Sequence, residues 1–151
     1  MRKSIPGVFA ALAAVSLPLQ AADGLLTLTS AHSVSETTNR LEAVLGKAGF
    51  KVFARVDHGA GAASVDMPLA PTELLIFGKP EAGTVLMQQQ ATVGIDLPLK
   101  YLVWQDADGK VMVGWNDPNW LAARHGIDQS LPPLQKMQGA LKKFASEAAK
   151  P

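Results

Sequence analysis

The sequence predicts an α+β protein, with an antiparallel sheet of about five strands and helices packed on one face. Two observations predict this class. Strand-like alternation of apolar residues outnumbers the long helical patterns, and strands and helices do not alternate regularly as in doubly wound parallel sheets. The chain has 151 residues, of which 48% are hydrophobic and 18% are charged. This size and composition suit one globular domain, with short helices in the connections.

The N-terminal segment, residues 1–21, has the layout of a secretory signal peptide. A basic start, "MRKS", precedes the uncharged run "IPGVFAALAAVSLPL" and the small residues of "QAAD". We expect cleavage near Ala21, although Leu19 is larger than the residue usual three positions before the cut. The alternative is an uncleaved anchor, but the apolar run is shorter than the roughly 20 residues of a spanning helix. We therefore expect a periplasmic or secreted protein with residues 22–151 as its single domain, and no stable membrane insertion after signal removal.

Charge and cysteine content exclude several classes of function. The formal net charge is +1, and loss of Arg2 and Lys3 lowers the 14 basic residues to 12, against 13 acidic ones. So weak a field predicts no nucleic-acid partner. Cysteine is absent, which excludes disulfides, thiolate catalysis and cysteine-ligated zinc. We expect no cofactor.

The first half of the domain begins with a strand at residues 24–31 and the clearest helix of the chain. Ser33 and Glu36 form a capping-box pattern at its start, and Gly49 is a natural stop. One apolar stripe contains Val34, Thr38, Leu41, Val44, Leu45 and Ala48.

Residues 50–58 return to the alternation of a strand. We expect Phe50, Val52, Ala54 and Val56 on one face, with Lys51, Phe53, Arg55 and Asp57 on the other. Residues 59–65 suit a short helix better than a loop. Residues 71–80 form a strand closed by Gly78 and Pro80, and residues 84–91 a short helix.

The second half contains a hairpin and two helices. Residues 99–116 suit two strands joined around Asp108-Gly109. Asp117 and Pro118 begin a helix that ends at Gly126, by the usual preference for aspartate as cap and proline in the first turn. After Pro132-Pro133, a last helix places Leu134, Met137, Leu141, Phe144 and Ala148 on one face.

Four segments together resemble the DUF302 family of uncharacterised bacterial and archaeal proteins. They are "DHGAGA", "PTELLIFGKPEAGTVLMQ", "GIDLPLKYLVW" and "NDPNWLAARHGI", and the likeness covers about residues 25–148. The resemblance implies a β-α-β4-α arrangement of the TBP-like type, in which helices lie across one face of a curved antiparallel sheet. It implies no activity, because a fold alone does not define a function.

His58 is the first candidate for chemistry, since histidine serves as base, proton shuttle or metal ligand. Asp57 and Asp66 are near in sequence, but no His-x-His or His-x3-His spacing supports zinc. We expect no metal, with His58, Asp66 and Glu73 as weak candidate ligands. The alternative is a histidine at a strand end that bonds the Gly59–Ala62 backbone.

Glu73 is the second candidate, because a lone carboxylate inside an apolar strand is costly unless it is solvated or paired. We expect either a solvent-facing or edge position, or a pair with His58 or Lys100. Lys100 and Asn116 complete the ligand-binding candidates. Asp117 and His125 have structural explanations as helix cap and as C-terminal dipole partner, and Arg124 as a solvated residue.

The remaining motifs exclude more than they suggest. The glycines match neither G-x-G-x-x-G nor the P-loop, and no G-x-S-x-G elbow occurs. Trp104, Trp115 and Trp120 lie within 17 residues and suit core, pocket or interface.

Two functions from different classes therefore remain. The first is a periplasmic small-ligand-binding or interaction module that uses the sheet surface and the groove under its helices, and we expect it to be a homodimer. The second is a small enzyme or metal site centred on His58 with a carboxylate such as Glu73. We favour the module, because His58 lacks an obvious second member for catalysis.

Overall fold

The computed structural model describes residues 22–151, so the predicted signal peptide at residues 1–21 lies outside the described residues. Five strands form one sheet in the order β1-β5-β4-β3-β2, and every neighbouring pair is antiparallel. Their bounds are β1 Leu25–Ser30, β2 Lys51–Asp57, β3 Thr72–Gly78, β4 Leu99–Gln105 and β5 Val111–Asn116. The first and last strands of the sequence are neighbours, which brings distant parts of the chain together.

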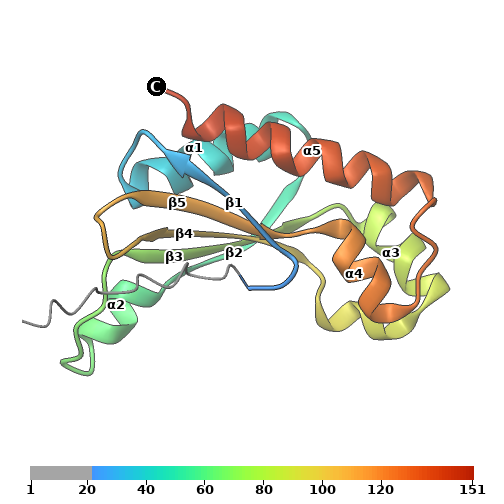
Figure 1. The fold of residues 1–151 in the computed structure, drawn as a ribbon, viewed down its shortest axis with the longest axis horizontal. Helices are drawn as coiled ribbons and strands as arrows, with labels where there is room; N and C mark the ends of the chain where they lie inside the picture. The colour runs from blue at the N-terminus through green and yellow to red at the C-terminus, as the bar shows by residue number, and fades with distance from the viewer. Residues whose placement is uncertain (1–21) are drawn as a thin grey trace, which may run out of the picture.

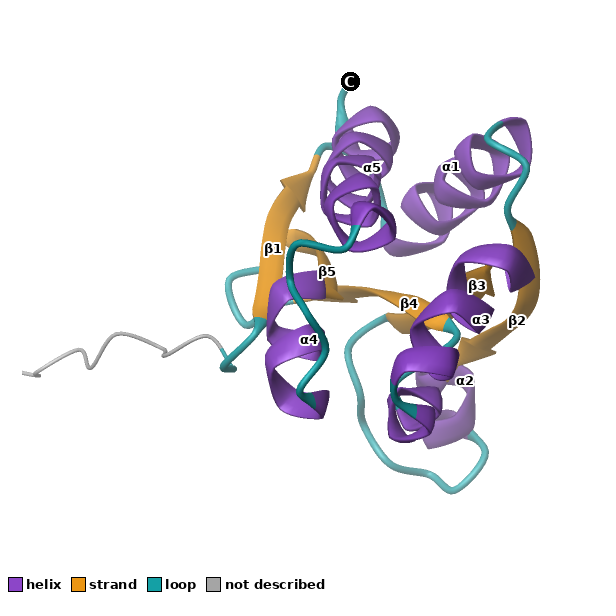
Figure 2. Ribbon diagram, turned by 90° about the vertical axis from the view of Figure 1, so that its right-hand side faces the viewer, coloured by secondary structure: helices purple, strands orange, loops and turns teal. Residues whose placement is uncertain are grey.

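Helices cover one face of this sheet. Figures 1 and 2 show α1 (Val34–Lys47) and α5 (Pro132–Ala149) side by side on the concave side of the curved sheet. The shorter helices are α2 (His58–Ala63), α3 (Pro80–Gln89), η1 (Ala91–Ile95, a 3-10 helix) and α4 (Pro118–His125). The predicted α+β class, with about five antiparallel strands and helices on one face, is confirmed.

Local signals place several of these elements correctly. Ser33 caps α1, with its hydroxyl accepting a hydrogen bond from the Glu36 backbone N–H at 3.2 Å. Asp117 caps α4, with its carboxylate accepting from the Asn119 N–H at 2.9 Å. Gly109 turns the β4–β5 hairpin with φ 79°, a conformation that glycine adopts without strain.

The start of α3 differs from the prediction. We expected a helix at residues 84–91 after a strand closed by Pro80, but α3 begins at Pro80 itself. Proline ends a strand and also suits the first turn of a helix, because the backbone N–H groups of that turn have no hydrogen-bond partner within the helix. The chain therefore enters a helix directly at the end of β3, and the 3-10 helix η1 follows.

A β-bulge changes the expected faces of β2. The register shifts between Val52 and Ala54, so that Val52 pairs with Phe77 and Arg55 pairs with Leu75. Phe77 and Leu75 are both buried under the helices, and paired residues share a face. Arg55 therefore lies on the same face as Val52, contrary to the expected strict alternation, because a bulge adds one residue to the strand.

The core lies between the sheet and the helices. Aromatic rings run through it: Phe50 contacts Phe77 and Phe144 edge to face, and Phe77 stacks on Tyr101 at 4.9 Å. Burial raises the pKa of the Tyr101 hydroxyl, which donates a 2.6 Å hydrogen bond to the Leu141 carbonyl of α5. This bond fixes α5 over the centre of the sheet.

Candidate functional site

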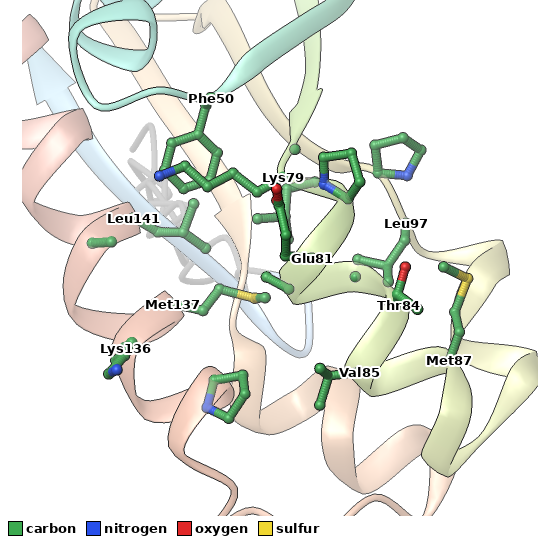
Figure 3. Close-up of a pocket in the computed structure, with 18 of the residues that line it drawn as sticks. Phe50, Lys79, Glu81, Thr84, Val85, Met87, Leu97, Lys136, Met137 and Leu141 are labelled. Atoms are coloured by element: carbon green, nitrogen blue, oxygen red, sulfur yellow. The ribbon is translucent and has the colours of Figure 1, made fainter.

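A cleft of about 870 Å³ opens beside the core, between α3 and α5. We call it the α3–α5 cleft. Its floor comes from the start of β2, the end of β3 and the start of β4, and its walls from the two helices (Figure 3). Its size is within the range of ligand pockets in proteins. The lining includes Phe50, Phe53, Val85, Met87, Leu97, Leu99, Met137, Leu141, Phe144 and four prolines.

Depth separates apolar from polar groups in this cleft. The buried lining residues are Gly78, Leu99, Met137, Leu141 and Phe144, and all are apolar. The charged and hydroxyl side chains of the lining are all at least partly exposed: Lys79, Glu81, Thr84 and Lys136. The interior thus favours a hydrophobic group, while polar contacts are restricted to the mouth.

Lys79 is held at the cleft by an aromatic ring. Its ammonium lies 4.6 Å from the centroid of Phe50, and Figure 3 shows the nitrogen beside that ring. A cation over an aromatic face is attracted by the ring quadrupole. Within residues 22–151, neither Lys79 nor Lys136 forms an ion pair. Both positive charges are therefore free to meet a ligand.

His58 lies apart from this cleft. It is the exposed first residue of α2, and Asp57 before it caps that helix by accepting from the Ala60 N–H at 2.8 Å. No hydrogen bond or ion pair in the described part of the chain joins His58 to Glu73 or Asp66. Nor do residues 22–151 contain a group of three or more His, Cys, Asp or Glu side chains that could hold a metal.

Glu73 takes neither of its expected positions. It is only 8% exposed and faces the helices, where Arg55 of β2 binds its Oε2 through Nη2 at 2.6 Å and Nε at 2.8 Å. Arg55 also donates to Asn39 of α1 at 2.7 Å. The solvent-facing position and the pairs with His58 or Lys100 are therefore wrong. The bulge in β2 brings Arg55 to this face and so supplies the partner that the buried carboxylate needs.

Lys100 and Asn116 point away from the helices. Their strand neighbours Leu99, Tyr101 and Trp115 are buried on the concave side, so alternation places both candidates on the convex face. The Lys100 ammonium donates to the carbonyls of Asp96 at 3.0 Å and Pro98 at 2.8 Å. Burial lowers the pKa of Lys100, and nearby Asp96 opposes that shift. The four candidates thus occupy separate places and do not form one site.

A compact polar cluster instead joins α4 to η1. His125 Nε2 lies 2.6 Å from Asp96 Oδ2, and His125 Nδ1 lies 3.0 Å from the Thr92 hydroxyl. Arg124 also binds Asp96, at 3.1 Å. This arrangement secures the segment that continues into Leu97 and Pro98, both of which line the cleft. We expected His125 to interact only with the helix dipole, but the structure also gives it a specific partner, the Asp96 carboxylate.

The tryptophans do not gather in one pocket. Trp115 is buried in the core and contacts Tyr101 edge to face. Trp104 lies on the convex face over Gly114, where an added methyl group would approach its ring to 2.9 Å, so glycine makes room for the indole. Trp120 packs over Gly24 from α4.

The residues of the cleft were largely missed as functional residues. Met137, Leu141 and Phe144 were correctly expected on one face of the last helix, but that pattern does not distinguish a core from a cleft wall. The exposed apolar side chains of α3, Val85 at 37% and Met87 at 40%, are visible only in the structure. Exposed apolar side chains on a short helix indicate a binding surface only once the positions of the neighbouring elements show that they border a cleft.

Comparison with known proteins gives two kinds of relative. A protein from Brucella suis biovar 1 named fluoride-specific ion channel FluC 1 is 47% identical over 127 residues, which cover 82% of this chain and 50% of that protein. FluC 2 of Brucella melitensis biotype 1 is 47% identical over 127 residues and 47% of its length. The chain therefore spans about half the length of these curated relatives. Among its described residues, no helix has the length and hydrophobicity required to cross a membrane.

The structural comparison agrees with the fold. A crystal structure of an uncharacterised conserved DUF302 protein from Bacillus stearothermophilus superposes with a TM-score of 0.66 and 22% identity. The match covers 85% of this chain and 97% of that one. The family described as "Domain of unknown function DUF302" matches residues 26–147, nearly the whole of the described fold. The chain therefore belongs to the DUF302 family.

Proposed function

We propose that this protein is an exported binding module that takes a small, largely apolar ligand into the α3–α5 cleft. The observation that carries the proposal is the cleft itself: about 870 Å³, with a buried lining that is entirely apolar. Burial of apolar ligand surface is the main driving force for binding in such a site. Met87 and Met137 add flexible side chains that adapt to ligands of different shape.

The four residues proposed from the sequence as ligand contacts do not support this site, because none of them lines the cleft. The catalytic alternative at His58 also lacks support from the arrangement, because Glu73 is engaged by Arg55. Export and the homodimer stay predictions.

Filling the cleft should weaken binding without unfolding the protein. Ala140 lines the cleft from α5 and is half-buried, so Ala140→Phe places a ring in the ligand space. We expect the affinity for the neutral fluorophore phenylnaphthylamine to fall by about ten-fold or more, since overpacking of an apolar site is costly. The measurement is fluorescence titration, with circular dichroism to verify the fold.

Gln138→Phe is the matched control, because Gln138 is exposed on the same helix and does not line the cleft. This variant should bind the fluorophore like the wild type. If the wild type fails to bind it, or if both variants lose affinity equally, the proposed site is wrong.

The curated relatives favour a second candidate function, a role beside a fluoride channel. In those proteins, about half of a chain named as a fluoride-specific channel is similar to this domain at 47% identity. We infer that this domain acts in the same process as those relatives.

Deletion of the gene should then raise the fluoride retained by cells after a fluoride load, as measured with a fluoride electrode. The wild-type gene should restore the original level, and complementation with Ala140→Phe tells whether the cleft is needed. Unchanged fluoride retention in the deletion strain would exclude this role and leave the ligand-binding proposal intact.

A further inference from the structure

We propose that the ligand of the α3–α5 cleft is an anionic amphiphile, a long-chain carboxylic acid whose head group binds at the mouth beside Lys79 and Lys136. This inference rests on the proposed function and names the class of ligand. It follows from the order of polarity with depth, from the balance of charge at the mouth, and from the position of the Lys79 ammonium.

The order of polarity excludes a ligand that is polar throughout. No buried side chain of the lining offers a donor or acceptor, so a hydroxyl or amide deep in the cleft would lose its bonds to water without replacement. Polar side chains occur only where the lining is exposed. A molecule with an apolar body and one polar end meets both conditions.

The balance of charge selects the sign of that polar end. The mouth carries two lysines and one glutamate, Glu81, and none of the three forms an ion pair within residues 22–151. One positive charge therefore remains in excess. A carboxylate gains Coulomb attraction there, while an ammonium head group would be repelled by the excess charge.

The position of Lys79 connects the charge to the apolar interior. Its ammonium lies over the ring of Phe50. Phe50 lines the cleft and contacts Phe144, which is one of the buried lining residues. Figure 3 shows Met137 and Leu141 extending from α5 into the same space, with Lys136 on the helix beside them. An alkyl chain along these side chains leaves its head group at the mouth, near the lysines.

The test compares three ligands with the same alkyl chain: dodecanoate, dodecanol and dodecylamine. Each is titrated as a competitor of phenylnaphthylamine, below its aggregation concentration. We expect dodecanoate to bind about five- to ten-fold more tightly than dodecanol, the sum of two partly exposed charge contacts. Dodecylamine should bind more weakly than dodecanol. Because the preference is electrostatic, it should shrink at high salt, whereas dodecanol should be nearly unaffected.

Charge-removing variants assign the preference to the mouth. Lys79→Gln combined with Lys136→Gln should abolish the preference for dodecanoate over dodecanol or reverse it, because Glu81 is then the charged side chain that remains at the mouth. The matched control, Lys142→Gln combined with Lys143→Gln, removes the same charge from exposed positions of α5 that do not line the cleft. It should retain most of the preference. Glu81→Gln should increase the preference for dodecanoate.

The outcomes separate this inference from the proposed function. If none of the three ligands displaces the fluorophore and the fluorophore itself does not bind, the cleft is not a binding site and both proposals fail. If dodecanol binds as tightly as dodecanoate in the wild type, or dodecylamine binds most tightly, the cleft binds ligands but the anionic head group is wrong. Equal loss of preference in the lysine pair and in its control would also overturn the assignment.

Discussion

Replacing Arg55 with methionine is expected to lower the free energy of unfolding by about 3 kcal/mol, because it leaves a buried carboxylate without its partner. Glu73 is 8% exposed, and Arg55 supplies its two charged hydrogen bonds. This loss of stability is at the lower end of the range for broken buried ion pairs, because the Arg55 side chain is 26% exposed and water can partly solvate the remaining carboxylate. Urea unfolding measures it, with a lower midpoint and an unchanged slope as the expected result.

A second variant tests the cause of that loss. Arg55→Met combined with Glu73→Met removes both charges and should recover part of the stability lost by the single change, because no buried unpaired charge is left. Glu42, 3.8 Å from Arg55 in the wild type, also loses its partner, but its side chain is 36% exposed and stays solvated. Arg124→Met is the control. Its side chain is 47% exposed, and its partner Asp96 keeps His125, so we expect a loss below about 1 kcal/mol. An Arg55→Met protein as stable as the wild type would contradict the role of this pair.

Leu45→Ala is expected to cost about 2–5 kcal/mol, because the vacated volume in a close-packed core is only partly refilled. Leu45 is 0% exposed and lies on the buried side of α1, one turn after Leu41. Thermal unfolding followed by circular dichroism measures the effect as a lower midpoint.

The neighbouring position gives a control of opposite sign. Gly46 is in the same helix, and a methyl group added there would have nothing within 4 Å. Gly46→Ala should raise stability by up to about 1 kcal/mol through helix propensity alone. If Leu45→Ala leaves the midpoint unchanged, α1 does not pack on the sheet as described.

Residue roles that depend on near neighbours in sequence could be predicted, whereas contacts between distant segments could not. Asp117 was expected to cap a helix, and the structure shows that cap; Asp57, expected only as a strand residue, caps α2 as well. The partner of Glu73 could not be predicted. It depends on a bulge at residues 52–54, where the sequence "KVFARVD" alternates as well without the extra residue.

The α3–α5 cleft shows the same limit on a larger scale. Phe50, Lys79, Leu97 and Lys136 line it from four segments separated by tens of residues. Each segment has an ordinary local explanation as strand start, helix start, turn or helix face. Their convergence depends on the order of the strands and on the direction in which α3 leaves the sheet at Pro80.

The sequence by itself determined the family, the α+β class, α1 with its Ser33 cap, the β4–β5 hairpin and the start of α4. These features depend on periodicity, capping and turn chemistry, which act between residues a few positions apart. Only the tertiary structure decided that Arg55 binds Glu73, that Lys100 and Asn116 face away from the helices, and that an apolar cleft opens beside Lys79. The physical reason is that these features arise from contacts between distant segments, and such contacts form only when sheet register and helix packing bring the segments together.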